Sequence, residues 1–129
     1  MPQQFQKHYT RDEARALLPR VREWLERIAT LRAELDSCEQ RIEGLRTHQS
    51  DLGGGSVNKQ VRLISGIKQV LNEFHVREIQ IKDLDRGLID FPAYVGGKEV
   101  FLCWERGEED VEFWHDLDAG YAGREPLDQ

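Results

Sequence analysis

Residues 91–104 read FPAYVGGKEVFLCW, and this stretch decides the fold of the chain. Apolar residues alternate on both sides of the pair Gly96-Gly97, which is the signature of a two-residue hairpin turn. Pairing across this turn places Phe91 opposite Leu102, so that both strands present one apolar face. A sheet is therefore expected in the C-terminal part of the chain.

The strand that follows this hairpin can pair with it in two registers. A reversal at 107–110 joins the strands, and we prefer the register in which Arg106 faces Val111. A slip of one residue would place Trp104 opposite Glu112, an apolar residue against a charged one. The preferred register puts a set of apolar side chains on one face of the sheet: Phe91, Ala93, Val95, Val100, Leu102, Trp104, Val111 and Phe113.

The pattern changes on either side of these strands. Alternation with a period of two begins near Val76 and predicts a first strand that ends near Asp83. Residues 119–129 lack such alternation, and we expect an irregular tail there. The expected sheet is small and antiparallel, with one face turned toward helices.

Residues 1–75 carry helical periodicity instead. Thr10 and Glu13 have the spacing of a capping box, so a helix of about 11–48 is expected to begin there. Pro19 removes one backbone hydrogen bond and predicts a kink or a short separate first helix. Apolar residues recur at spacings of four and three, the heptad pattern of a helix that packs lengthwise against others: Leu17, Val21, Trp24, Ile28, Leu31, Leu35, Cys38, Ile42 and Leu45.

A glycine-rich loop at 50–56 separates this helix from a second one at about 57–75. Glycines 53–55 favour a tight reversal, and the spacing of a phosphate-binding P-loop is absent. The second helix carries two apolar stripes: Val57, Val61, Ile64 and Leu71 in the first, and Leu63, Ile67, Val70 and Phe74 in the second. So wide an apolar face needs more than one neighbour, and a homodimer through the helical hairpin would supply it.

The chain of 129 residues is long enough for one modest core. We therefore predict an α+β fold in which a long helical hairpin, similar to an antiparallel coiled coil, spans residues 1–75. A small antiparallel sheet with its tail spans residues 76–129 and shares the core of the hairpin.

Charge and hydropathy exclude several functional classes. Residues 1–75 hold twelve Lys or Arg against ten Asp or Glu, a net charge of +2, whereas residues 76–129 hold six against fourteen, a net charge of −8. So acidic a surface repels nucleic acids. No apolar run approaches the roughly 20 residues of a membrane span. Cys38 and Cys103 lack the spacing of secreted disulfides, so we expect a cytoplasmic protein with reduced thiols.

One group of side chains could bind a divalent metal ion. Carboxylates with an imidazole suit a divalent cation, and a cysteine beside a histidine favours zinc. The candidate residues are Asp83, Asp85, Asp90, Cys103, His115, Asp116 and Asp118. The preferred register, however, sets Cys103 opposite Trp114 and points it away from His115, which argues against a zinc pair.

Two turn sequences, 83–87 and 116–120, offer a simpler explanation for most of these aspartates. Both read Asp-x-Asp-x-Gly, and in an Asx turn the aspartate accepts a backbone amide while the glycine is left-handed. This interpretation needs no ion, and we predict no cofactor.

Catalytic and ligand-binding roles have similar alternatives. His115 could serve as a general base oriented by Asp116 or Asp118, but neighbouring residues of a strand point apart, so Asp116 is poorly placed for this role. Trp104, Trp114 and Arg124 could contact a ligand or a partner. Alternatively, the tryptophans belong to the core and the arginine pairs with the acidic sheet.

Short motifs along the chain form a recognisable pattern: Tyr9-Thr10, Glu13-Ala14, Leu17-Leu18-Pro19, Val21, Gly87-Leu88-Ile89-Asp90-Phe91-Pro92, Leu102-Cys103-Trp104, Gly107-Glu108, Trp114-His115 and Gly123-Arg124. The pattern spans nearly the whole chain and resembles a prokaryotic family, domain of unknown function 2203. This resemblance implies a small soluble bacterial protein. The family has no assigned activity, so the resemblance transfers no functional residues.

The leading hypothesis is a non-enzymatic protein-interaction or structural module that acts as a dimer, because no catalytic constellation is recognisable. Its acidic sheet would face a protein partner. The alternative is a metal-dependent enzyme or metal sensor that uses His115 and the aspartate turns. A third hypothesis is a small-ligand module built on Trp104, Trp114 and Arg124.

Overall fold

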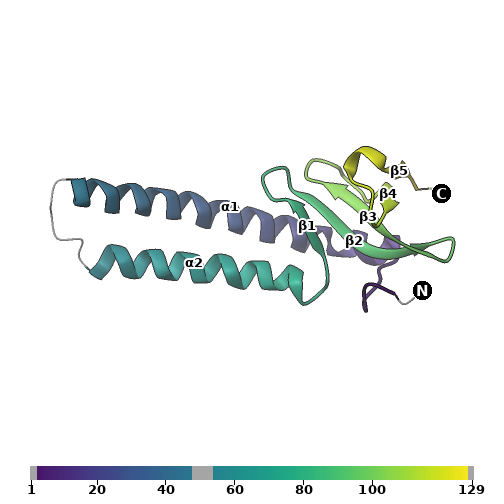
Figure 1. The fold of residues 1–129 in the computed structure, drawn as a ribbon, viewed down its shortest axis with the longest axis horizontal. Helices are drawn as coiled ribbons and strands as arrows, with labels where there is room; N and C mark the ends of the chain where they lie inside the picture. The colour runs from purple at the N-terminus through teal and green to yellow at the C-terminus, as the bar shows by residue number, and fades with distance from the viewer. Residues whose placement is uncertain (1–2, 48–53, 128–129) are drawn as a thin grey trace. The chain divides into compact units, whose positions relative to one another are not determined.

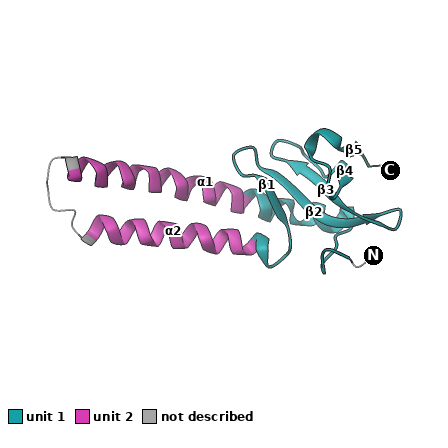
Figure 2. Cartoon of the chain, in the orientation of Figure 1, with its two compact units in different colours: residues 1–22, 74–129 teal, residues 23–73 magenta. Residues whose placement is uncertain are grey.

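The computed structural model describes residues 3–47 and 54–127 (Figure 1). Its fold is α+β, with two helices followed by a five-stranded antiparallel sheet. The chain forms two compact units, residues 1–22 with 74–129, and residues 23–73 (Figure 2). The first unit contains the sheet and the start of the first helix, and the second contains most of both helices.

Helix α1 spans Arg11–Thr47 and helix α2 spans Gly54–His75. Within residues 23–73 they lie side by side, and much of the predicted seam is buried (Figure 2). The buried seam residues are Ile28, Leu31, Cys38 and Ile42, and Leu25 of α1 and Leu63 and Val70 of α2 are buried as well. Gly66 permits close packing of α2, since a Cβ atom there would lie 3.3 Å from Cδ1 of Leu31.

The helices differ from the prediction at two places. α1 runs through Pro19 as one helix, so the prediction of a separate first helix is wrong. Leu18 and Val21, on either side of Pro19 in the sequence, are buried and hold this part of the helix in the core. α2 begins three residues earlier than predicted, because residues 54–56 form its first turn. Residues 50–53 of the predicted loop lie outside the described residues. Neither described helix combines the length and the apolar character needed to cross a membrane.

The capping box at the start of α1 is confirmed. Oγ1 of Thr10 accepts a hydrogen bond from the Glu13 amide at 3.1 Å, and Oε1 of Glu13 accepts one from the Thr10 amide at 2.9 Å. Both amides would otherwise lack a partner at the helix start. These two bonds explain why α1 begins at Arg11.

Two glutamates hold the N-terminal segment, residues 4–8, in the unit that contains the sheet. Glu99 accepts hydrogen bonds from two consecutive backbone amides, at 2.7 and 2.9 Å, and contacts Nε2 of His8 at 2.7 Å. Glu78, which has a left-handed φ of 58°, accepts the next two amides at 2.9 and 2.6 Å. The segment is thus fixed by its backbone amides and also by side chains, since buried Phe5 packs against Phe101 with ring centroids 5.4 Å apart.

Five antiparallel strands form the sheet, in this spatial order: β1 (Gln80–Asp83), β2 (Leu88–Val95), β3 (Lys98–Glu105), β4 (Phe113–Asp116) and β5 (Glu125–Pro126). β2 and β3 pair as predicted, with Phe91 opposite Leu102. Gly96 and Gly97 have φ angles of 59° and 79°, the left-handed conformation that a two-residue hairpin turn requires.

The register of β3 and β4 differs from the predicted one by a single residue. Leu102 pairs with Trp114, whereas the prediction paired it with His115. β4 starts only at Phe113, because Val111 lies in the connecting loop, where its carbonyl accepts a hydrogen bond from an arginine of α1 at 2.7 Å. The slip turns every residue of β4 to the face opposite the predicted one.

The faces of the sheet therefore differ from expectation on β4. Phe91, Leu102 and Trp104 share one face, and the guanidinium of Arg22 on α1 lies 5.5 Å from the Trp104 ring centroid. Phe113, predicted to share this face, belongs to the other one.

The predicted irregular tail is wrong in part. A 3-10 helix, Tyr121–Gly123, leads into β5, and β5 pairs with β4 through Phe113 and Pro126. The amide of Leu127 adds a hydrogen bond to the Glu112 carbonyl at 2.8 Å. An edge strand tolerates proline, since its outer amides need no partner strand.

Candidate metal centre

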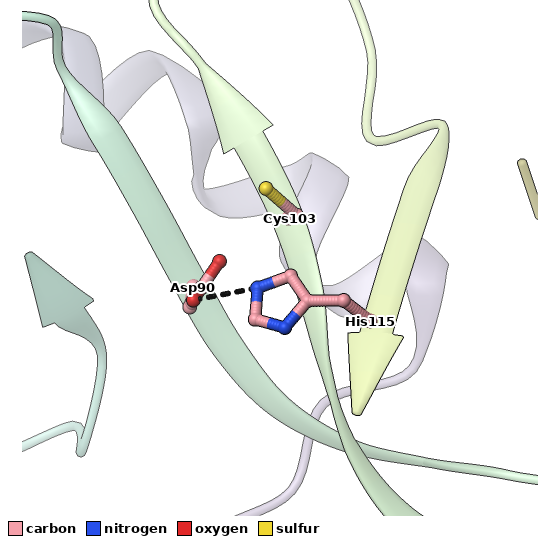
Figure 3. A group of neighbouring side chains, drawn as sticks. All are labelled: Asp90, Cys103 and His115. Atoms are coloured by element: carbon pink, nitrogen blue, oxygen red, sulfur yellow. Dashed lines mark hydrogen bonds and ion pairs between the residues drawn. The ribbon is translucent and has the colours of Figure 1, made fainter. Parts of the chain in front are cut away.

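Three adjacent strands bring Asp90, Cys103 and His115 together on one face of the sheet (Figure 3). Asp90 on β2 lies directly opposite Cys103 on β3. Cys103 in turn pairs with Phe113 on β4, and His115 follows two residues later, so it points to the same face. The predicted register had placed Cys103 and His115 on opposite faces of the sheet, and this separation argued against a zinc pair. In the structure both residues lie on the same face, so that objection no longer holds.

The three side chains are almost completely buried, with exposed fractions of 1% for Asp90, 0% for Cys103 and 2% for His115. One ligand atom from each residue lies within 4.8 Å of the other two. Nε2 of His115 is 2.9 Å from Oδ2 of Asp90. The second carboxylate oxygen, Oδ1, is buried and has no full hydrogen bond among the described residues, although the Cys103 thiol acts on the carboxylate as a weak donor.

The hydrogen bonds of His115 define which of its nitrogens carries a proton. Nδ1 lies 2.7 Å from the backbone oxygen of Asp116, which can only accept, so Nδ1 is the donor. The contact of Nε2 with Asp90 then requires one further proton, held by either the ring or the carboxyl group. A metal ion could bind Nε2 in place of this proton.

Burial sets the acid–base properties of the other two residues. It raises the pKa of Asp90, and the charge of His115 acts in the opposite direction. It also raises the pKa of Cys103 to about 12, an effect to which the Asp90 carboxylate adds. At neutral pH such a thiol stays protonated and is a poor nucleophile, which argues against cysteine–histidine catalysis in this state.

A divalent ion of borderline softness fits this donor set. Imidazole nitrogen, thiolate and carboxylate oxygen are the ligands that zinc takes in proteins. The hydrogen bond from Nδ1 of His115 to a backbone carbonyl is the usual outer support of a metal-ligating histidine. An ion would also give Oδ1 of Asp90 a stronger partner than the Cys103 thiol.

A cavity of about 240 Å³ opens onto the cluster. Asp90 and His115 form part of its wall. The rest of its lining includes Lys82, Leu88, Leu117, Asp118 and Tyr121. A small molecule in this cavity would contact any ion held by the two wall residues.

The first aspartate turn matches its prediction and the second does not. Oδ1 of Asp83 accepts a hydrogen bond from the Arg86 amide at 3.1 Å, and Gly87 has a left-handed φ of 67°. In the turn 116–120, by contrast, Gly120 has a φ of −103°. The two turns are therefore not equivalent, although their sequences match.

The turn aspartates lie outside the cluster. Asp85 is exposed, and Asp116 forms an ion pair with Lys98 at 2.8 Å. Asp118 lines the cavity but is exposed. Of the predicted aspartate ligands, the structure brings Asp90 alone together with His115 within the described residues.

Of the three predicted ligand contacts, Trp104 and Arg124 have other partners. Trp104 and Trp114 point to the face opposite the cluster, and Nε1 of buried Trp104 donates to the Glu108 carbonyl at 2.9 Å. Arg124 pairs with the Glu108 carboxylate at 2.7 Å, in agreement with the alternative of an acidic partner. Its Nη1 also lies 3.9 Å from Sγ of Cys103, which places a positive charge beside the thiol.

Sequence reasoning did not single out Lys82. Lys82 lies at a register shift between β1 and β2, and its side chain reaches the face that carries the cluster, where it lines the cavity together with Asp90 and His115. Regular alternation along β1 does not predict this position, because the register shift interrupts it. Nor does a local signal fix where β4 begins, and that start decides whether His115 joins Cys103.

The family described as "Uncharacterized conserved protein (DUF2203)" matches residues 7–127. The match covers nearly the whole chain, in agreement with the resemblance carried by the short motifs. No curated protein and no solved structure matches.

Proposed function

The chain belongs to the DUF2203 family of uncharacterised conserved proteins, and we propose that it binds one divalent metal ion of the zinc type. The ligands are Asp90, Cys103 and His115. Two free, buried cysteines support a cytoplasmic location, which we include in the proposal.

The observation that carries this proposal is the convergence of three buried donor residues around a carboxylate oxygen, Oδ1 of Asp90. Among the described residues this oxygen has no full hydrogen bond and only the weakly donating Cys103 thiol nearby. Burying a carboxylate oxygen without a full hydrogen bond costs about 1–3 kcal/mol or more, and a chain with no use for the carboxylate could place an apolar residue at this position. The nearby thiol and imidazole are donors that complete a metal site, with all three ligand atoms within 4.8 Å of one another. Ion binding would replace the costly contact with three coordinate bonds.

The ligand count favours a reactive or exchangeable site over a purely structural one. Structural zinc sites usually have four protein ligands, whereas catalytic sites have three and leave one position for an external molecule. The cluster supplies three, and the cavity adjoins it. This arrangement supports a metal-dependent enzyme or sensor over a structural zinc site. The ligands that accompany His115 would be Asp90 and Cys103, and the residues of the aspartate turns would not be ligands.

Elemental analysis of protein purified without a metal-affinity tag tests the proposal. We expect about one zinc-type ion per chain after reconstitution, loss of the ion in His115→Ala and Cys103→Ser, and retention in His75→Ala, where an exposed histidine is removed. Circular dichroism verifies that each variant is folded. Wild-type protein that stays metal-free in excess Zn²⁺, or equal metal content in all variants, would reject the site.

Dimerisation through the helical hairpin remains a second proposal because one stripe of α2 is uncovered. Val57, Val61 and Ile64 are 39%, 61% and 37% exposed, and they recur at helical spacing. A second copy that covers this stripe would complete the packing of the hairpin.

Light scattering across micromolar concentrations tests this second proposal. We expect a dimer for the wild type, a monomer for Val61→Glu and a dimer for Gln69→Glu, which adds the same charge at an exposed polar position of α2. A monomeric wild type at all concentrations would eliminate the dimer.

A further inference from the structure

Beyond the bound ion, we infer that the cavity takes a small carboxylate-bearing anion, which completes the coordination of the metal and pairs with Lys82. This inference rests on the proposed metal site and names the class of molecule that occupies its open position. It uses two independent observations, the position of Lys82 and the size and lining of the cavity.

Lys82 extends across the face of the sheet that carries the cluster. Its Nζ lies 4.7 Å from the ring centroid of Phe101, two strands away from β1. Phe101 pairs with His115, and their ring centroids are 5.6 Å apart. The ammonium group therefore lies near the cluster, and its charge acts on Asp90.

Charge balance favours a monoanion at this position. A divalent ion is neutralised by the Asp90 carboxylate and the Cys103 thiolate, because His115 binds as neutral imidazole. Lys82, whose side chain is exposed, then adds a charge of +1 to the cavity wall near the cluster. Asp118 is exposed as well and adds the opposite charge to the lining, but its charge also acts on Lys98.

The cavity selects a small molecule with an apolar part. Its volume of about 240 Å³ lies below the roughly 300–1,000 Å³ of pockets for drug-sized ligands. Leu88, Leu117 and Tyr121 supply apolar wall next to the charged end. A short-chain carboxylate is small, carries a single negative charge and has an apolar part. A phosphate dianion exceeds the available positive charge and has no apolar part.

Cobalt-substituted protein provides the test, because Co²⁺ in a thiolate site has visible absorption bands that change with its ligands. Propionate should perturb the ligand-field bands saturably, and inorganic phosphate should bind more weakly. Lys82→Met removes the charge and keeps the side-chain length; we expect it to weaken propionate binding about tenfold, the effect of losing one close charge pair. Lys68→Met, at an exposed position of α2, should bind as the wild type does.

The outcomes separate the two proposals. Absence of thiolate-to-cobalt absorption in the wild type rejects the metal site and the anion site together. Cobalt binding without a response to propionate leaves the metal site intact and overturns the anion site. Phosphate binding as tight as propionate binding, or a Lys82→Met variant that binds propionate normally, also overturns it.

Discussion

Replacing Asp90 by Asn should make the metal-free protein more stable while weakening its metal binding. The carboxyl group is 1% exposed, one oxygen contacts His115, and the other has no full hydrogen bond, with the weakly donating Cys103 thiol nearby. In the variant the Asn amide can donate to Nε2 of neutral His115, so the site no longer needs an additional proton. Removing the ionisable group should raise the free energy of unfolding by about 1–3 kcal/mol at neutral pH.

The pH dependence of this difference follows from the direction of the pKa shift. Burial raises the pKa of Asp90 in the folded protein above its unfolded value. The folded state therefore binds a proton more tightly, and stability is lost as the pH rises from the unfolded pKa through the folded one. The stabilisation by Asn should be present at neutral pH and vanish below about pH 3.5, where both states are protonated.

Thermal unfolding of chelator-treated protein measures this effect, with an expected rise in Tm of about 3–10 °C. Asp118→Asn is the matched control, because it removes an exposed aspartate of the same cavity and should leave Tm nearly unchanged. A lower Tm for Asp90→Asn at neutral pH would refute the reasoning, since it would mean that the carboxylate stabilises the metal-free fold.

Three further substitutions test the structure away from the cluster. Burial alone would raise the pKa of Glu99, but hydrogen bonds from the N-terminal segment and His8 lower it overall. Glu99→Gln should therefore cost about 1–2 kcal/mol at neutral pH, a loss that shrinks below pH 4 in pH-dependent urea denaturation. Gly97→Ala should cost about 1 kcal/mol by the same assay, since φ is 79° there. Trp104→Phe should cost about 2–4 kcal/mol in calorimetry, because it opens a buried cavity and removes the donor to a backbone carbonyl.

The parts of the fold that local chemistry encodes were predictable. Thr10 and Glu13 define a helix start by direct hydrogen bonds, and Gly96-Gly97 fixes the β2–β3 pairing by a turn of known length. In each case the interacting residues are neighbours in sequence. The signal is therefore contained in a window of a few residues.

The register of β4 was not predictable in this way. Its start at Phe113 depends on how the loop after β3 is held, and α1 holds that loop through the Val111 carbonyl, about one hundred positions away in sequence. Hydrophobic alternation alone favoured the other register, because it ignores such distant contacts. The sequence therefore drew attention to Asp90, Cys103 and His115, but it did not predict that they lie together.

An ion bound at the proposed site would have a topological role as well as a chemical one. Asp90 and His115 are 25 positions apart, so an ion that bridges them closes a loop comparable to that of a disulfide. In the chain-entropy treatment of cross-links, a loop of this length restricts the unfolded chain by about 3.5 kcal/mol. An ion that stays bound to both residues would thus act as a reversible cross-link across β2, β3 and β4. A chelator would then increase the conformational entropy of the unfolded chain as well as remove the ion from the site.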